Sequence, residues 1–433
     1  MKKVLVAVLV LGFISAALFA GGQSDEAATL TVWTGFPETE STLKKAVEIF
    51  VADNPKVKVE ILTFDFTDLQ DKALVSIPAG SAADVVVQEM TDMYGFAKAG
   101  WLAKAPNDVQ SWIKKPGRYV NTAVPIISYK DAIYAMPFQT GGPALFYNKT
   151  FFAEAGLKTA PETVEQVRDY AVKLRKMNAS GALTRAGYSI RLTGPGGGTQ
   201  KFSFIAYQFS GKQVIEPGKA PETFHASCEA PGQAEALQWY VSLLHGKDKS
   251  DDWGLKHDSE GFAAGDAAMF MRESWVVPFM KDSAPTVDYG VAVQPKGKSW
   301  GVLDYVAGLT VPAAGKHTAL AWKFTLAVQN ETVMKTLLQE SGWIPPRRDV
   351  SYEEIFAKEP HFRPFIEQPK GLVTYFEPNL SASHEIWVGV GEIVQEAYRD
   401  AALLGNLAGC QAVMKKAADK VNQILKEAKE YGE

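Results

Sequence analysis

Cysteine is scarce in this sequence. The 433 residues include only Cys228 and Cys410. A chain of this length does not need a disulfide to fold, and buried free thiols are common in protein interiors. In an oxidising compartment the same two residues could instead form one disulfide. The sequence leaves both interpretations open. A metal site built on the two cysteines is a third interpretation, with less support than the other two.

The residue patterns of several enzyme classes are missing. The six histidines show no His-Glu-x-x-His spacing, there is no Gly-x-Ser-x-Gly turn, and the glycine-rich stretch lacks the Lys-Ser/Thr ending of a phosphate-binding loop. A glycosidase needs two carboxylates at a defined separation in space, which adjacent pairs such as Asp251 and Asp252 do not indicate. We therefore predict no catalytic residues, no metal and no cofactor.

The chain also lacks an excess of positive charge and, beyond its first twenty residues, a long apolar run. Its formal net charge is −4, from 45 Lys and Arg against 49 Asp and Glu. That balance offers no basic surface for nucleic acid or an anionic membrane. No later window approaches the roughly eighteen consecutive apolar residues of a membrane-spanning helix. We expect neither nucleic acid nor membrane as a partner.

The N-terminus has the pattern of a secretory signal peptide. Lys2 and Lys3 precede an apolar stretch from Val4 to Ile14, and small residues follow up to Ala20. We predict a signal peptide over residues 1–20, with a retained anchor as the lesser alternative. A lipoprotein would carry Cys where this sequence has Gly21, so the predicted location is the periplasm, without lipidation.

The first part of the remaining chain alternates strand and helix patterns. Apolar strand patterns cover Leu30–Trp33, Val57–Leu62 and Asp84–Gln88, and helical periodicity covers Ser41–Asp53 and Leu69–Ile77. This β-α-β-α-β order predicts an α/β fold with a parallel sheet covered on both faces. Ligands of such sheets bind beyond the carboxyl ends of the strands. About 410 residues favour two domains.

A second unit begins after a strand at 133–138. Gly141-Gly142-Pro143 indicates a crossover into another strand at 144–149. The glycine-rich patch Gly194–Gly198 is expected to be a flexible loop. Helical patterns dominate the rest, at 164–178, 233–244, 318–329, 331–340 and 411–431.

Several ordinary segments occur together in a specific order and spacing. They are Leu30–Thr34, Phe50–Pro55, Asp84–Val87, Ala135–Pro137, Leu145–Lys149, Phe262–Met269, Tyr289–Ala292, Ala307–Leu309 and Gly342–Pro345. In this arrangement the chain resembles the family 1 extracellular solute-binding proteins of ATP-driven (ABC) importers, the group that includes maltose-binding protein. The resemblance covers nearly the whole chain after the signal peptide.

The resemblance implies a type II periplasmic-binding-protein fold, in which two discontinuous α/β lobes close on a ligand in a central cleft. By analogy, lobe one comprises 28–137 plus 289–340, and lobe two comprises 138–288 plus 341–433. Hinges are expected near 137–142, 286–290 and 341–346. The implied partners are a small polar solute, most simply a mono- or oligosaccharide, and the permease subunits and ATPase of an importer. A monomer is expected.

Candidate ligand-binding residues follow the strands of the first unit. Thr34, Gly35 and Phe36 come after the first strand, and Gln88 and Glu89 end the third, where polar groups can reach bound hydroxyls. Glu89 is equally readable as a solvated loop charge.

Aromatic and polar candidates lie elsewhere in the chain. Trp275 follows an apolar strand where the family commonly has a ring that stacks on the ligand, although it could instead be a core residue beside Val276 and Val277. Trp343, at an expected hinge, suits cleft and packing roles equally. The crossover and later strands add four further candidates: Gln139, Thr140, Tyr147 and Gly308.

Arg347 and Arg348 keep an anionic ligand open. A guanidinium pair suits the phosphate of glycerol phosphate or the carboxylate of an acidic sugar, although arginines after prolines are often surface charges. A sugar-sensing receptor module is a further alternative, and a periplasmic glycosidase is the least supported.

Overall fold

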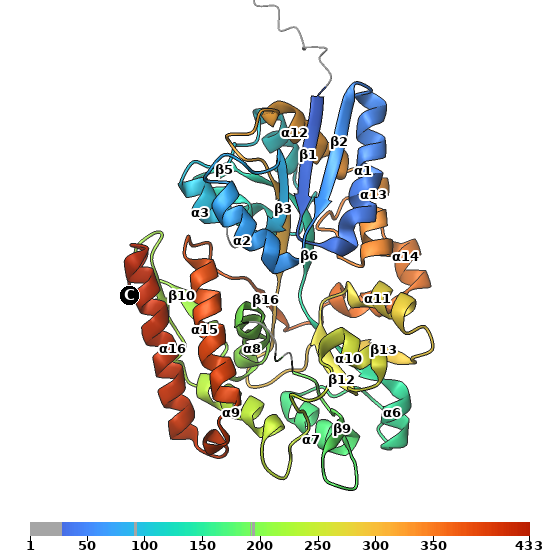
Figure 1. The fold of residues 1–433 in the computed structure, drawn as a ribbon, viewed down its shortest axis with the longest axis vertical. Helices are drawn as coiled ribbons and strands as arrows, with labels where there is room; N and C mark the ends of the chain where they lie inside the picture. Colours follow the sequence, from blue (N-terminus) through green and yellow to red (C-terminus); the bar gives the residue numbers. More distant parts are fainter. Residues whose placement is uncertain (1–27, 91–92, 191, 193–194) are drawn as a thin grey trace, which may run out of the picture.

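A computed structural model describes residues 28–90, 93–190, 192 and 195–433 (Figure 1). The predicted signal peptide, residues 1–20, lies outside the described residues. Across the described ranges, no helix is both long and apolar enough to cross a membrane.

The first strands and helices form as predicted. Strands β1 (Ala28–Thr34), β2 (Val57–Thr63) and β3 (Val85–Glu89) pair in parallel, and helices α1 (Glu40–Asp53) and α2 (Phe66–Ser76) connect them. The buried residues Leu43, Ala46 and Phe50 share one face of α1 at the spacing of helical turns.

The three strands are parallel to one another, as predicted, but the sheet also contains two later strands and is mixed. Its order is β2-β1-β3-β15-β6, and β15 (Tyr305–Thr310) runs antiparallel to both β3 and β6 (Ala135–Gly141). The reason lies in the chain path. Strand β6 leaves the sheet at the edge where β1 and β3 also end, and β15 returns from that edge, so it must run in the opposite direction.

A second sheet follows the predicted crossover. Two residues separate the end of β6 from strand β7 (Ala144–Asn148), which pairs antiparallel with β12 (Met269–Arg272) and β13 (Tyr289–Ala292). Residues 289–340 were expected to belong to lobe one. Strand β13, at the start of that range, instead belongs to the second sheet.

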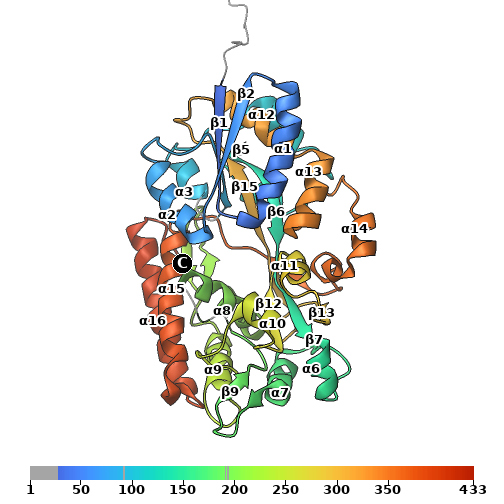
Figure 2. The same ribbon diagram turned by 45° about the vertical axis from the view of Figure 1, so that its right-hand side comes forward.

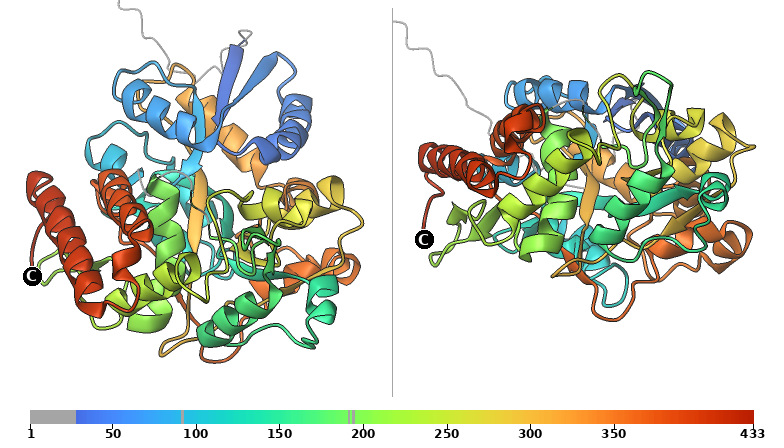
Figure 3. Two further views of the ribbon diagram at one scale, coloured as in Figure 1. Left: turned by 60° about the horizontal axis from the view of Figure 1, so that its bottom comes forward. Right: turned by 90° about the horizontal axis from the view of Figure 1, so that it is seen from below.

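Helices build most of the lower half of the molecule (Figures 1 and 2). They are α7 (Val164–Leu174), α8 (Pro195–Ser210), α9 (Gln233–Leu244), α15 (Ser383–Tyr398) and α16 (Leu407–Glu427). Helix α15 packs against both α8 and α16, and Figure 3 shows these C-terminal helices, coloured orange to red, together at one side of the molecule.

The remaining elements are short. The helices among them are α3 (Met93–Lys98), α4 (Asn107–Ile113), α5 (Ala123–Ile126), α6 (Lys149–Glu154), α10 (Asp258–Ala264), α11 (Val276–Ser283), α12 (Thr318–Val328), α13 (Glu331–Thr336) and α14 (Glu353–Lys358), with single turns at η1 (Pro37–Thr39), η2 (Leu337–Ser341), η3 (Pro360–Phe365) and η4 (Ala401–Leu403). The strands are β4 (Ser128–Tyr129), β5 (Ala132–Ile133), β8 (Lys176–Met177), β9 (Leu183–Arg185), β10 (Ile215–Pro217), β11 (Phe224–Ala226), β14 (Gly301–Leu303) and β16 (Val373–Tyr375).

The glycine-rich patch is not the expected loop, apart from Gly194, which is outside the described residues. Helix α8 begins at Pro195 and includes the three glycines that follow. Proline is tolerated in the first turn because its missing N–H has no helical partner there. At Gly198, a Cβ atom would lie 2.4 Å from the Gln395 amide nitrogen on α15, so glycine permits the close packing of the two helices.

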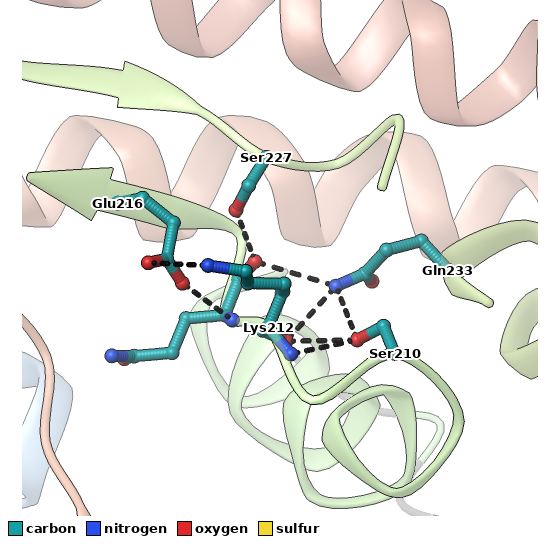
Figure 4. A network of polar contacts seen from close by, with 6 residues as sticks. Ser210, Lys212, Glu216, Ser227 and Gln233 are labelled. Carbon is teal, nitrogen blue, oxygen red and sulfur yellow. Dashed lines mark hydrogen bonds and ion pairs between the residues drawn. The ribbon is translucent and has the colours of Figure 1, made fainter. Parts of the chain in front are cut away.

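A polar network holds the other end of α8 (Figure 4). The buried Gln233 amide, at the start of α9, donates to Ser210 Oγ (3.2 Å) and to the Lys212 carbonyl (3.1 Å). Lys212 Nζ in turn lies 3.2 Å from Glu216 Oε2 on β10. Helix α8 is thereby tied to α9 and β10 where it ends.

The second sheet lies between two hydrophobic cores, because alternate side chains of its strands point to opposite faces. On β12, Phe270 faces the core that continues up to the five-stranded sheet, whereas Met269 and Met271 face the core built on α8, α9, α15 and α16. Successive side chains of a strand point to opposite faces.

Both cysteines lie in the helical core, as free buried thiols. The interpretation without a disulfide is therefore the one that the structure supports. Burial raises the pKa of the Cys228 thiol to about 12.

Candidate ligand-binding cleft

A pocket of about 210 Å³ lies between the five-stranded sheet and the lower half of the molecule. Loops after β1 and β3, the start of β15 and the turn before α11 contribute to it. Its lining residues are Gly35, Phe36, Pro37, Glu38, Phe66, Glu89, Gln200, Arg272, Glu273, Trp275, Tyr305 and Trp343. A smaller hollow shares Glu89, Gln200 and Tyr305 with the pocket and extends it toward residues 376–379.

Hydrogen bonds hold the loop after β1 in a tight turn. Thr34 Oγ1 accepts from the Phe36 N–H at 3.1 Å, and Thr39 Oγ1 donates to the Phe36 carbonyl at 2.7 Å. The two threonines are buried. They fix the backbone that presents Gly35 and Phe36 at the carboxyl end of the strand, where α/β sheets place their ligands.

Three aromatic rings form one wall of the pocket. The Trp343 ring lies edge-to-face with Phe36 (6.0 Å between centroids) and with Tyr305 (5.6 Å). The indole N–H of Trp343 donates to Glu38 Oε1 at 2.6 Å, which fixes the ring in place. Burial raises the pKa of the Glu38 carboxyl, although its hydrogen bonds, including the one from Trp343, act in the opposite direction.

A network of buried charges supports the opposite wall. Glu273 accepts from Lys201 Nζ at 2.8 Å and pairs with Arg272 at 3.0 Å, and Arg272 also pairs with Asp258 at 2.8 Å. Burial alone would raise the pKa of Glu273, but the charges of Arg272 and Lys201 outweigh it and lower this pKa to about 2. The Arg272 guanidinium lies 4.9 Å from the centre of the Trp275 ring, so this network positions an aromatic side chain of the pocket.

Residues 34–331 match the family model described as "Bacterial extracellular solute-binding protein". The chain belongs to this family. The match spans more than half of the chain and includes loops on both sides of the pocket.

Comparisons with individual members agree with this solute-binding family. The chain is 23% identical over 401 residues to the maltotriose-binding protein of Pyrococcus abyssi, covering 90% of this chain and 81% of that one. It is 27% identical to the sn-glycerol-3-phosphate-binding periplasmic protein UgpB of Escherichia coli O1:K1 / APEC, over 64% of this chain and 63% of that one. A solute-binding protein from Thermotoga lettingae, solved with α-D-tagatose, superposes with a TM-score of 0.76 at 23% identity, covering 92% of this chain and all of that one. The predicted α/β fold of the maltose-binding-protein type is confirmed.

Five of the residues selected from the sequence line the pocket of this solute-binding protein: Gly35, Phe36, Glu89, Trp275 and Trp343. Thr34 lies directly behind it, in the turn described above. Trp275 is half-buried beside Arg272, so the structure brings it to the pocket and also packs it against Phe279.

Three further candidates lie inside the five-stranded sheet. Gln88 on β3 pairs in register with Gly308 on β15, and Gln139 on β6 pairs with Ala307. Both glutamine side chains are buried, and their amide atoms have no hydrogen-bond partner among the described residues. A Cβ atom at Gly308 would lie 2.9 Å from the Met136 carbonyl oxygen, so this glycine serves close strand packing.

The remaining three candidates lie away from the pocket. Thr140 donates to Asp304 and lines a different cavity. The Tyr147 ring packs against Phe152, in the second sheet. Arg347 pairs with Asp349 at 2.8 Å, so this guanidinium already has an anionic partner within the protein.

The sequence prediction missed six residues of the pocket. Five of them have a polar or charged group in the side chain, namely Glu38, Gln200, Arg272, Glu273 and Tyr305, and the sixth is the aromatic Phe66; Pro37, which is neither polar nor aromatic, also lines the pocket. A usable signal existed for two of them, because Arg272 and Glu273 immediately precede Ser274-Trp275. Within the part of the chain that the structure describes, there is no cluster of three or more residues suited to hold a metal ion.

Proposed function

We propose that this protein captures a neutral mono- or oligosaccharide in the pocket and delivers it to the permease of an ABC importer. The observation that supports the proposal most directly is the combination of Phe36, Trp275, Tyr305 and Trp343 with the carboxyl groups of Glu38 and Glu89. Flat rings suit the apolar faces of a sugar, and planar polar groups suit its hydroxyls. The adjoining hollow gives space for a ligand longer than one ring.

A neutral ligand fits the charges better than an anionic one. Among the described lining residues, Arg272 is the cation, and it already pairs with Asp258 and Glu273. Glu38 and Glu89 would repel a phosphate. Anionic solutes therefore remain the second candidate, either acidic sugars or glycerol 3-phosphate, which the name of the Escherichia coli relative gives as its ligand.

The proposed motion is hinge closure of two lobes. We place the crossings where the chain passes between the two sheets, at the β6–β7 junction, at the β14–β15 junction and after Arg348. The residues of the pocket then come from both sides of the hinge, so closure would surround the ligand. The same proposal describes the protein as a periplasmic, unlipidated monomer without enzymatic activity. As an alternative, closure on the ligand would serve a sugar-sensing receptor instead of an importer.

Ligand binding can be tested by thermal unfolding of the refolded, ligand-free protein. Maltotriose, tagatose, mannitol, glycerol 3-phosphate and amino acids form the panel. A ligand at a hundredfold its dissociation constant adds about 2.7 kcal/mol, a shift of several degrees. We expect a saturable shift with a neutral carbohydrate, which is recovered chemically unchanged.

The site is tested by Trp275→Ala, which should abolish or strongly reduce that shift. The matched control is Trp101→Ala, because Trp101 is an exposed tryptophan outside the pocket. Equal loss in both variants would refute the assigned site. A shift with glycerol 3-phosphate alone would favour the anionic candidate, and turnover of a sugar would favour an enzyme.

A further inference from the structure

A second cavity, of about 170 Å³, lies behind the strands that connect the two halves of the molecule. Side-chain alternation separates it from the 210 Å³ pocket, although Asp304 also borders the adjoining hollow. Tyr305 and Trp343 line the pocket, whereas their chain neighbours Asp304 and Ile344 line this second cavity. Successive residues of an extended segment point to opposite sides. We call this second space the back cavity.

Hydrogen-bond acceptors are concentrated in the back cavity. Asp304 Oδ1 accepts from Thr140 Oγ1 (2.7 Å) and from the Gly141 N–H (3.0 Å), which leaves Oδ2 for another donor. Gln294 is 2% exposed, and its Oε1 has no hydrogen-bond partner among the described residues, although its Nε2 donates to the Phe204 carbonyl. Buried polar atoms are normally satisfied, so Gln294 Oε1 requires a donor from water or from a ligand, whereas the half-buried Asp304 carboxylate can accept a further hydrogen bond.

A positive charge lies in the same lining. Arg348 is exposed as a residue, and its backbone N–H bonds to the Arg118 carbonyl. Its guanidinium forms no ion pair within the described part of the chain. Burial raises the pKa of Asp304, and the charge of Arg348 acts in the opposite direction. The preceding residue, Arg347, differs in that its guanidinium forms an ion pair with Asp349. The back cavity thus combines two oxygen acceptors with a cation that is available to an anion.

We propose that the back cavity is a second binding site, for a small zwitterion of the α-amino acid class. The ligand ammonium would donate to Asp304 Oδ2 and Gln294 Oε1, and the ligand carboxylate would accept from Arg348. The cavity is large enough for several water molecules, which suits a small ligand such as alanine or serine. Val293, Val302 and Leu372 supply an apolar wall for its side chain.

Binding to this site can be measured by isothermal titration calorimetry, whether or not the front pocket binds a sugar. L-alanine, L-serine and L-threonine are the probes. Propionate lacks the ammonium, glycerol tests a polyol, and inorganic phosphate tests an anion. We expect saturable binding of at least one amino acid and none of the three comparison compounds.

Two variants locate the site. Asp304→Asn keeps an oxygen that accepts from Thr140 and Gly141 but removes the charge, and Arg348→Gln removes the cation. Each should weaken amino acid binding roughly tenfold or more, because it breaks a charge-assisted contact. Asp282→Asn, at an exposed aspartate on α11 outside the back cavity, is the matched control and should bind as the wild type does.

Three results would overturn the proposal. The first is the absence of saturable amino acid binding at millimolar concentration, which would assign the cavity to water only. The second is binding of glycerol or phosphate alone. The third is unchanged affinity in both variants, which would place the amino acid elsewhere. If Asp304→Asn does not fold, Arg348→Gln still tests the site, because its side chain makes no ion pair within the described residues.

Discussion

At the scale of single residues, Glu273 shows how a charged side chain can be buried beside a ligand pocket. It is 2% exposed, yet Lys201 and Arg272 keep it ionised. Removing one member of such a group leaves the other charges buried without compensation, which commonly costs about 3 kcal/mol or more. The network therefore fixes the turn that carries Trp275.

Glu273 also predicts an acid dependence of stability. Its pKa falls from 4.5 to about 2 on folding, so its contribution is fully present above about pH 4.5 and is lost as the pH falls toward 2. The difference corresponds to about 3 kcal/mol.

In urea unfolding between pH 6 and 3, Glu273→Gln should be less stable at pH 6 and should lose less stability on acidification. Glu60→Gln, at an exposed site on β2, should follow the wild type; the same acid slope in Glu273→Gln would contradict the assignment.

The sequence revealed part of the pocket at this scale. Gly35, Phe36 and Glu89 were found because ligand positions follow strand ends, a local property. Tyr305 and Gln200 were missed because their place depends on which strand and helix pack beside the pocket. Arg347 lies outside the pocket and pairs with Asp349, a partner that the sequence alone does not reveal.

At the scale of elements, local periodicity located β1 to β3 and the helices between them to within a few residues. The orientation of β15 could not be predicted, because it depends on a pairing with β3 more than 200 residues away in the chain. Helix α8 was missed for a different reason. Its glycines have low helix propensity, and the close approach of Gly198 to Gln395 on α15 depends on a pairing of helices that the local sequence does not show.

Gly142 provides a test of the crossing between β6 and β7. A Cβ atom there would lie 2.5 Å from the Leu303 carbonyl oxygen, whereas one at Gly141 would lie 3.8 Å from the Trp343 ring. Gly142→Ala should therefore destabilise the protein by about 1–3 kcal/mol, as overpacking does. Gly141→Ala is the neighbouring control and should have a smaller effect in chemical denaturation. Equal effects of the two substitutions would show that space is not the constraint at this crossing.

At the scale of the whole molecule, a buried contact joins its upper and lower halves far from the connecting strands. Helix α3 faces the ends of α15 and α16 near the C-terminus (Figures 1 and 2). Glu430, which is fully buried, accepts from Lys98 Nζ of α3 at 2.8 Å and from the backbone N–H and hydroxyl of Ser381. This contact stabilises the arrangement in which the two halves touch.

Glu430→Gln should shift the proposed hinge equilibrium toward an open form, because it removes the charge that holds Lys98. We expect a larger radius of gyration in small-angle X-ray scattering without ligand, and weaker binding of whichever sugar stabilises the wild type. The control is Asp419→Asn, which removes an exposed partner of Lys415 on α16. An unchanged radius together with unchanged affinity would show that this contact does not influence closure.

The side chains of Asp304 and Tyr305 face opposite cavities, which limits the insertions and deletions that this part of the gene can tolerate. Inserting or deleting a single codon before β15 would exchange the two side chains, and every later residue of the strand would turn to the other face until the register recovered. Length variation among descendants of this sequence should therefore accumulate in exposed connections, such as the turn around Gly181, and be rare between β14 and β15.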